Sequence, residues 1–177
     1  PEELSNQLGL PVLAMVQKLT IDQNTGVDSL QVHVANESVE SEAFRTLRTT
    51  LAFSGRELGR VAITSSEPGD GKTTVLANLA VTYAQAGKKT LLIDADLRRP
   101  GLTRLMGQRG HAGVSDVVHG EGDIAQHCTQ LISTTQVEGL DLLPCGTKTP
   151  AYPRCTQWQD LASVRWHPVT STATVTR

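Results

Sequence analysis

The chain has 177 residues, enough for one domain with a substantial core. Its 16 Lys and Arg against 18 Asp and Glu give a formal charge of −2, so no strong overall field draws it to nucleic acid or anionic lipid. Three cysteines without a C-x-x-C spacing predict neither a disulfide framework nor a zinc site.

A leading segment, residues 1–37, is the first unit that the pattern predicts. Residues 1–8 favour a short helix and residues 11–16 a short strand, whereas residues 20–29 are polar and rich in turn formers. The apolar stretch over residues 8–16 is short, is interrupted by glycine and proline, and lacks a basic flank. It therefore indicates neither a signal peptide nor a membrane span.

A core of alternating helices and strands is predicted to follow. Apolar residues at helical spacing predict a helix over residues 38–53, with Ser38 or a nearby serine as its N-cap. Two short apolar runs, residues 60–64 and 89–94, predict buried parallel strands. The Ala- and Leu-rich segment between them, residues 73–86, predicts the helix that connects them by a right-handed crossover.

The second half of this core carries weaker signals. Residues 114–118 and 124–131 favour short helices, and residues 140–144 favour another core strand. The core, residues 38–150, is therefore expected to be an α/β domain with a mostly parallel sheet.

The chain changes character after Pro150. Residues 151–177 show no sustained period of 2 or 3.6 residues, and their end is nearly all small and polar. We expect this segment to be a disordered or non-native tail, the result of a truncation or frameshift, and the sheet to be incomplete at the C-terminus.

The segment from residue 66 to residue 74 predicts a phosphate-binding loop, because it follows a predicted strand and opens a long helix. Gly69 and Gly71 permit a close backbone approach, Lys72 can reach the β- and γ-phosphates, and Thr73 can offer a hydroxyl to Mg²⁺. We expect the nucleotide to be bound by Gly69, Asp70, Gly71, Lys72, Thr73 and Thr74.

This loop departs from the strict pattern G-x-x-x-x-G-K-[ST] at one position. Ser66 stands where the first glycine should be. The alternative interpretation is a polar turn before a helix, but the order of strand, loop and helix favours nucleotide binding, with ATP and Mg²⁺ as cofactors.

Asp94 and Asp96 lie where the predicted strand over residues 89–94 ends. Carboxyl ends of strands in open α/β sheets face the ligand crevice, so both carboxylates should lie near the phosphates, with Mg²⁺ between them. The alternative is a role as helix-capping or turn aspartates. Arg98 and Arg99, next along the chain, could contact phosphate or a partner, although a solvated basic turn explains them equally simply.

Four stretches of the chain resemble the cytoplasmic kinase domain of the bacterial tyrosine kinases of exopolysaccharide and capsule synthesis. They are residues 9–13, residues 42–49, residues 64–74 and residues 92–100. The resemblance covers residues 1 to about 150 and implies a P-loop NTPase-type three-layer fold. In this family a serine at position 66 is usual.

The resemblance implies an autophosphorylating, Mg-dependent protein-tyrosine kinase. Lys72 would neutralise the developing charge, Thr73 would hold Mg²⁺, and Asp94 and Asp96 would organise the metal and assist removal of the tyrosine proton. Which aspartate is the base stays open. The partition and septum-placement ATPases are related, but their signature lysine, five residues before the loop lysine, is Glu67 here.

The resemblance also implies partners. Glu42, Arg45 and Arg48 match a motif of the family that is associated with assembly into a ring, although a solvated charged helix face remains an alternative. A membrane polysaccharide co-polymerase segment or subunit would hold the domain at the inner face of the plasma membrane, in the cytoplasm. The expected role is regulation of polysaccharide synthesis and export.

After Pro150 the resemblance ends. The family continues with an apolar strand that ends in the Walker B aspartate and with a tyrosine-rich tail, and neither pattern follows here. Tyr83, in the helix after the loop, fits packing better than phosphate acceptance. A catalytically inactive nucleotide-binding or assembly module, or a ParA- or MinD-like ATPase, therefore stays as the alternative function.

Overall fold

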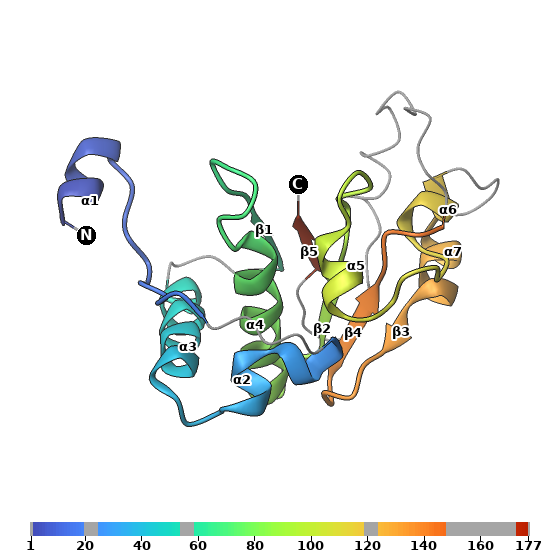
Figure 1. The fold of residues 1–177 in the computed structure, drawn as a ribbon, viewed down its shortest axis with the longest axis horizontal. Helices are drawn as coiled ribbons and strands as arrows, with labels where there is room; N and C mark the ends of the chain where they lie inside the picture. Colours follow the sequence, from blue (N-terminus) through green and yellow to red (C-terminus); the bar gives the residue numbers. More distant parts are fainter. Residues whose placement is uncertain (1, 20–24, 54–58, 119–123, 148–172, 177) are drawn as a thin grey trace.

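The computed structural model describes residues 2–19, 25–53, 59–118, 124–147 and 173–176 (Figure 1). Its helices are α1 (Glu2–Leu8), the 3₁₀ helix η1 (Gly26–Ser29), α2 (Gln31–Val34), α3 (Val39–Ala52), α4 (Lys72–Gln85), α5 (Gly101–Leu105), α6 (Val114–Val118) and α7 (Ile124–Leu131). Its strands are β1 (Arg60–Ile63), β2 (Thr90–Ile93), β3 (Ser133–Thr134), β4 (Leu140–Leu143) and β5 (Ala173–Thr176).

The strands form one five-stranded sheet in the order β1-β5-β2-β4-β3. All neighbouring pairs are parallel except the pair of β3 and β4, which is antiparallel at one edge. Because β1 and β2 run in the same direction, the segments that follow them leave the sheet at the same edge, the upper one in Figure 1. The predicted phosphate loop and the predicted aspartates both belong to this edge.

Helices cover both faces of the sheet, so the fold has three layers. Leu92 and Leu142 belong to a buried cluster with residues of α2, α3, α4 and α5. Leu91 and Leu143, one position away on the same strands, belong to a second cluster with residues of α6 and α7. This alternation follows from the period of two along a strand, and it confirms the predicted α/β fold with a mostly parallel sheet.

The helices expected around the loop are confirmed. Ser38 caps α3, because its hydroxyl accepts a hydrogen bond from the Ser41 N–H at 3.1 Å. Asn78 is completely buried in α4 and joins it to α2, since its Oδ1 accepts from the Val32 N–H at 2.9 Å. Such a satisfied polar contact fixes the position of α4, the helix that the phosphate loop opens.

Two expectations for the first half of the chain are wrong. Residues 11–16 form no strand, because no neighbouring strand supplies the ladder that such a short segment needs. β1 is at the edge of the sheet rather than buried, and its residues alternate between exposed and half-buried.

The longest helices among the described residues, α3 and α4, have 14 residues each, which is too short to cross a bilayer.

The expectation for residues 151–177 has two outcomes. Residues 148–172 and 177 lie outside the described residues, so for them it stays a prediction. For residues 173–176 the expectation of no strand is wrong, because they form β5 between β1 and β2, with Ala62 opposite Val175 and Leu92 opposite Thr174. Three of these four residues are β-branched and suit a pleated strand, although they lack the long apolar run that we sought.

Candidate functional site

The phosphate loop joins β1 to the N-terminus of α4. Gly71 is the N-cap of α4 and has a φ of +88°, a left-handed conformation that favours glycine. A Cβ at this position would meet nothing within 4 Å, so the requirement for glycine is torsional rather than steric. Within the described residues no side-chain cap is seen at the N-terminus of α4, so the N–H groups of its first turn are available to bind an anion.

Asp70 closes the loop on itself. Its Oδ2 accepts hydrogen bonds from the Glu67 N–H at 2.9 Å and from the Ser66 hydroxyl at 3.0 Å. These bonds, the Glu67 N–H first, lower the pKa of the Asp70 carboxyl below its usual value. The Asp70 side chain therefore shapes the loop, and only its main-chain N–H is left for a phosphate.

Lys72 and Thr73 open α4 with side chains that have no hydrogen bond or ion pair to the rest of the described chain. The first turn of α5 lies against Thr73: a Cβ added at Gly101 would be 2.8 Å from the Thr73 hydroxyl oxygen. Because Gly101 has no side chain, the Thr73 hydroxyl can occupy this position without a clash. The sequence analysis missed Gly101, which only this close approach reveals.

Asp94 is completely buried just after β2. Its Oδ2 accepts from the Thr103 N–H at 2.7 Å, and its Oδ1 accepts from the Asp96 N–H at 3.2 Å. Burial is the largest influence on the pKa of Asp94 and raises it, while the hydrogen bonds from Thr103 and Asp96 lower it. Asp94 thus caps α5 from outside the helix, which was the alternative that the sequence left open.

Asp96 is half-buried at the same edge. Its Oδ1 accepts from the Arg99 N–H at 2.9 Å, and no bond to its other oxygen is seen within the described residues. The capping bonds that join Asp94 to α5, together with the contact of α5 with Thr73, bring the ends of β2 and the start of α4 together. The prediction that both aspartates share an edge of the sheet with the loop is therefore supported by the fold.

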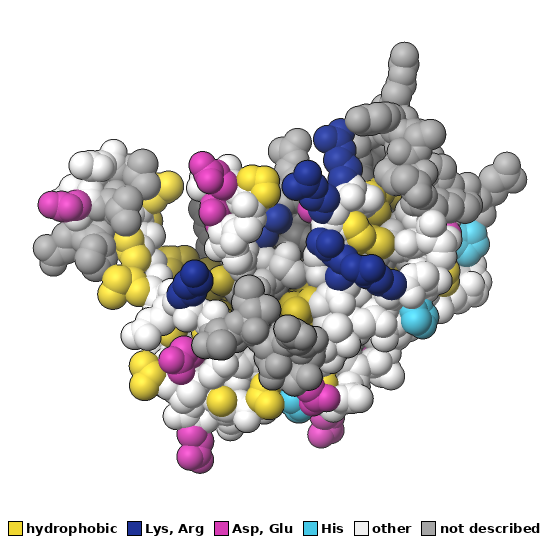
Figure 2. All heavy atoms as spheres, in the orientation of Figure 1, with side chains coloured by type: hydrophobic (Ala, Val, Ile, Leu, Met, Phe, Trp, Pro, Cys, Tyr) yellow, Lys and Arg dark blue, Asp and Glu magenta, His cyan; other side chains and the backbone are white. Residues whose placement is uncertain are grey.

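Basic and acidic side chains both lie at this edge. Arg98, Arg99 and Arg104 are exposed on α5 and on the segment before it. Figure 2 shows the Lys and Arg side chains gathered on this face, over α5 and toward the loop. These arginines would attract a polyphosphate bound at the start of α4.

The donors at this edge suit Mg²⁺ in a complex with a nucleotide. Among the described residues no group of three or more His, Cys, Asp and Glu side chains could hold a metal alone. Mg²⁺ is usually bound by one or two carboxylates together with substrate phosphates. Asp96 has an unbonded carboxylate oxygen and Thr73 an unbonded hydroxyl, so the residues present fit that arrangement.

The three residues of the predicted assembly motif lie on α3, but they differ in their contacts. Arg45 forms an ion pair with Glu42 at 2.9 Å and hydrogen bonds with Asn36. Arg48 donates to the Thr82 carbonyl at 2.6 Å and so joins α3 to α4. Glu42 and Arg45 remain at the surface, whereas Arg48 already has a structural contact within the chain.

Tyr83, which projects from α4, is a packing residue. Its hydroxyl is buried and has no hydrogen-bond partner among the described residues. Burial raises the pKa of this hydroxyl, and the charge of Arg48 lowers it. The interpretation that this tyrosine packs rather than accepts phosphate is therefore supported.

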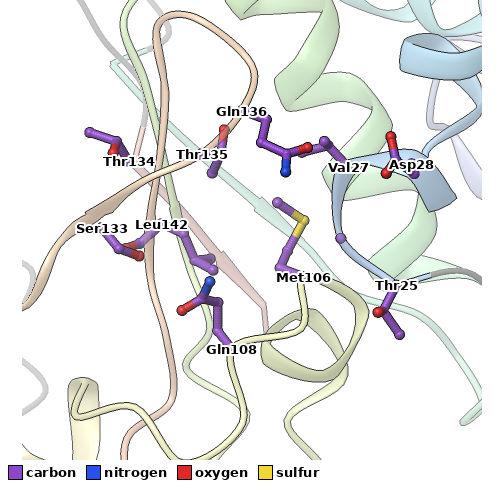
Figure 3. A pocket seen from close by; sticks show the side chains of 11 residues that line it. Thr25, Val27, Asp28, Met106, Gln108, Ser133, Thr134, Thr135, Gln136 and Leu142 are labelled. Carbon is purple, nitrogen blue, oxygen red and sulfur yellow. The ribbon is translucent and has the colours of Figure 1, made fainter.

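A cavity of about 430 Å³ lies elsewhere, between η1, the end of α5 and the strands β3 and β4 (Figure 3). Gln136, Met106 and Val27 point toward it. None of the predicted site residues lines it. The predicted phosphate site is therefore separate from this cavity.

Comparisons with known proteins agree with this geometry. Residues 61–138 match the family model described as "CobQ/CobB/MinD/ParA nucleotide binding domain". The chain is 39% identical over 116 residues to "Tyrosine-protein kinase YwqD" of Bacillus subtilis, a match that covers 64% of this chain and 47% of that protein. It is 36% identical over 126 residues to "Putative tyrosine-protein kinase CapB" of Staphylococcus aureus, covering 70% and 54%.

A solved structure extends the likeness to almost the whole chain. The crystal structure of "the chimerical protein CapA2B2" superposes with a TM-score of 0.79 and 32% identity, covering 99% of this chain and 74% of that one. The chain spans about half the length of the curated relatives that it matches. The MinD and ParA name describes only the broader group. The chain belongs to the bacterial tyrosine-protein kinase family, within the P-loop nucleotide-binding domains.

Proposed function

We propose that this chain binds Mg·ATP at the loop before α4 and transfers the γ-phosphate to tyrosine hydroxyls. The observation that carries the proposal is the N-terminus of α4, where Lys72 and Thr73 have no side-chain hydrogen bond or ion pair within the described residues, beside the two aspartates that follow β2. Phosphoryl transfer depends on positioning and charge stabilisation, which are the properties that this edge supplies.

Each residue has a part in the proposed reaction. The main-chain N–H groups of residues 69–74 and the ammonium of Lys72 would bind the phosphates and stabilise the charge that develops on them. Thr73 and Asp96 would hold Mg²⁺, which supplies further charge neutralisation when bound. Asp94 would support this arrangement from its buried position, because its carboxylate accepts a hydrogen bond from the Asp96 N–H.

The proposal includes partners. Relatives are named as tyrosine-protein kinases, and CapA2B2 is described as a chimerical protein. We propose that the domain acts in the cytoplasm at the inner face of the plasma membrane, with a membrane polysaccharide co-polymerase segment or subunit, and that it regulates exopolysaccharide or capsule synthesis. Self-assembly would use the exposed pair Glu42 and Arg45 on α3.

Phosphotyrosine formation tests the catalytic part. The chain is incubated with Mg·ATP and a tyrosine-containing peptide, and phosphotyrosine is measured by mass spectrometry beside Lys72→Met. We expect phosphorylated peptide with the parent chain and none with the variant. Nucleotide binding without any phosphotyrosine would instead favour the second function, an inactive nucleotide-binding or assembly module.

Sedimentation tests the assembly part. Arg45→Ala removes the ion pair with Glu42 and the hydrogen bonds with Asn36, and it should lower self-association at a cost in folding stability of about 1–2 kcal/mol. An unchanged sedimentation profile would contradict a role of this helix face in assembly.

A further inference from the structure

Thr103 is a buried polar residue of α5 that the sequence analysis did not single out. Only 1% of its surface is exposed. Polar groups buried this deeply normally have hydrogen-bond partners, and the identity of those partners indicates what the residue does.

Two polar groups of Thr103, its N–H and its hydroxyl, are bonded at the carboxyl edge of the sheet. Its N–H donates to Asp94 Oδ2 at 2.7 Å, and its Oγ1 accepts from the Cys145 N–H at 2.9 Å. Thr103 therefore joins the residue after β2 through its main-chain N–H and a residue just after β4 through its hydroxyl.

The position of α5 is fixed by these contacts. Gly101, two residues before Thr103, lies against the Thr73 hydroxyl at the start of α4. A helix of five residues has few internal hydrogen bonds and relies on external contacts for its position. The N–H of Thr103 alone suffices to cap the helix on Asp94, so the hydroxyl has a separate role.

We propose that Thr103 is a positioning residue of the nucleotide site: its hydroxyl anchors α5 to the main chain of Cys145 and thereby holds in place the Thr103 N–H that bonds the Asp94 carboxylate. The inference rests on the proposed function, because it assigns to Asp94 a place beside the Mg·ATP complex. Residues that orient metal-side groups without touching the metal commonly decide how tightly it is held.

The test compares two substitutions at one position. Thr103→Val keeps the shape of the side chain and removes the hydroxyl, whereas Thr103→Ser keeps the hydroxyl and removes the methyl group. Calorimetry measures the ATP affinity of each variant with Mg²⁺ and with EDTA. We expect Thr103→Val to reduce the Mg²⁺-dependent gain in affinity by at least about tenfold, without a matching loss in EDTA, and Thr103→Ser to retain it.

A matched control removes a second buried threonine hydroxyl. Thr90 lies at the opposite end of β2, is 3% exposed, and donates to the Lys88 carbonyl at 2.9 Å. Thr90→Val should leave the Mg²⁺-dependent gain unchanged even if it lowers stability. In an Asp94→Asn background, Thr103→Val should cause no further loss, because its effect acts through that carboxylate.

Each outcome decides the inference. An unchanged gain in Thr103→Val, or an equal loss in Thr103→Ser, overturns the positioning role alone. A parent chain that binds ATP equally with and without Mg²⁺ overturns both the inference and the metal-dependent site on which it rests. Should Thr103→Val fail to fold, Thr103→Cys, with its weaker hydrogen-bonding thiol, takes its place in the same comparison.

Discussion

Asp94→Ala should destabilise the fold by more than the removal of so small a side chain suggests. The carboxylate accepts two main-chain hydrogen bonds, from Thr103 at 2.7 Å and from Asp96 at 3.2 Å. Hydrogen bonds to a charged group contribute about 1.5–3 kcal/mol each, and the unfavourable burial that raises the pKa of Asp94 offsets part of that gain. We therefore expect a net loss of about 2–3 kcal/mol, a large share of the about 5–15 kcal/mol typical of a domain.

Urea unfolding followed by circular dichroism measures this loss at pH 7. Asp96→Ala is the matched control, because Asp96 is only half-buried and accepts one bond, from the Arg99 N–H at 2.9 Å. It should cost no more than about 1 kcal/mol. If Asp94→Ala unfolds within about 0.5 kcal/mol of the parent, or if Asp96→Ala costs more, the capping role of Asp94 is wrong.

The stability that Asp94 contributes should also depend on pH in a definite direction. The folded-state pKa of Asp94 is above its usual value of 3.8, so the folded state binds the proton more tightly than the unfolded state does. The stability that Asp94 contributes is then greatest below pH 3.8 and decreases as the pH rises through the folded pKa. The difference in free energy of unfolding between the parent and Asp94→Ala should shrink as the pH rises from 3.8 through the folded pKa. A difference that grows with pH would contradict the reasoning.

Three further predictions concern the loop and its helix. Lys72→Met should abolish ATP binding in calorimetry and leave the circular dichroism spectrum unchanged, because this side chain makes no ion pair within the described residues. Gly101→Ala should weaken Mg·ATP binding, since its Cβ would lie 2.8 Å from the Thr73 hydroxyl; an unchanged calorimetric affinity would contradict that close contact. Arg48→Ala should lower the free energy of unfolding by about 1–2 kcal/mol, because the guanidinium bonds the Thr82 carbonyl; equal urea midpoints would argue against it.

The sequence predicted the order of the elements around the loop because their signals are local. The apolar spacing of residues 38–53 and the Ala-rich residues 73–86 correspond to α3 and α4. The spacing of apolar residues does not distinguish an edge strand from a buried one. The apolar run over residues 60–64 therefore predicted a buried strand, whereas β1 lies at the edge of the sheet. Position within a sheet depends on long-range pairing, which local pattern does not contain.

Other features could not be predicted because they exist only after the chain folds. β5 occupies an interior position although its sequence is mostly threonine and alanine, since its neighbours β1 and β2 supply the ladder on both sides. The contact of Gly101 with Thr73 and the bond of Thr103 to Cys145 join residues 28 and 42 positions apart. No spacing rule identifies such pairs, and a lone glycine or threonine has too many ordinary roles.

The most direct test of the account is a calorimetric titration of ATP into the chain with Mg²⁺ and with EDTA. The account predicts that Mg²⁺ tightens binding and that Lys72→Met abolishes it, because the loop before α4 and the donors beside it form one site. Equal affinity in the parent and the variant would place the nucleotide elsewhere and contradict the central claim.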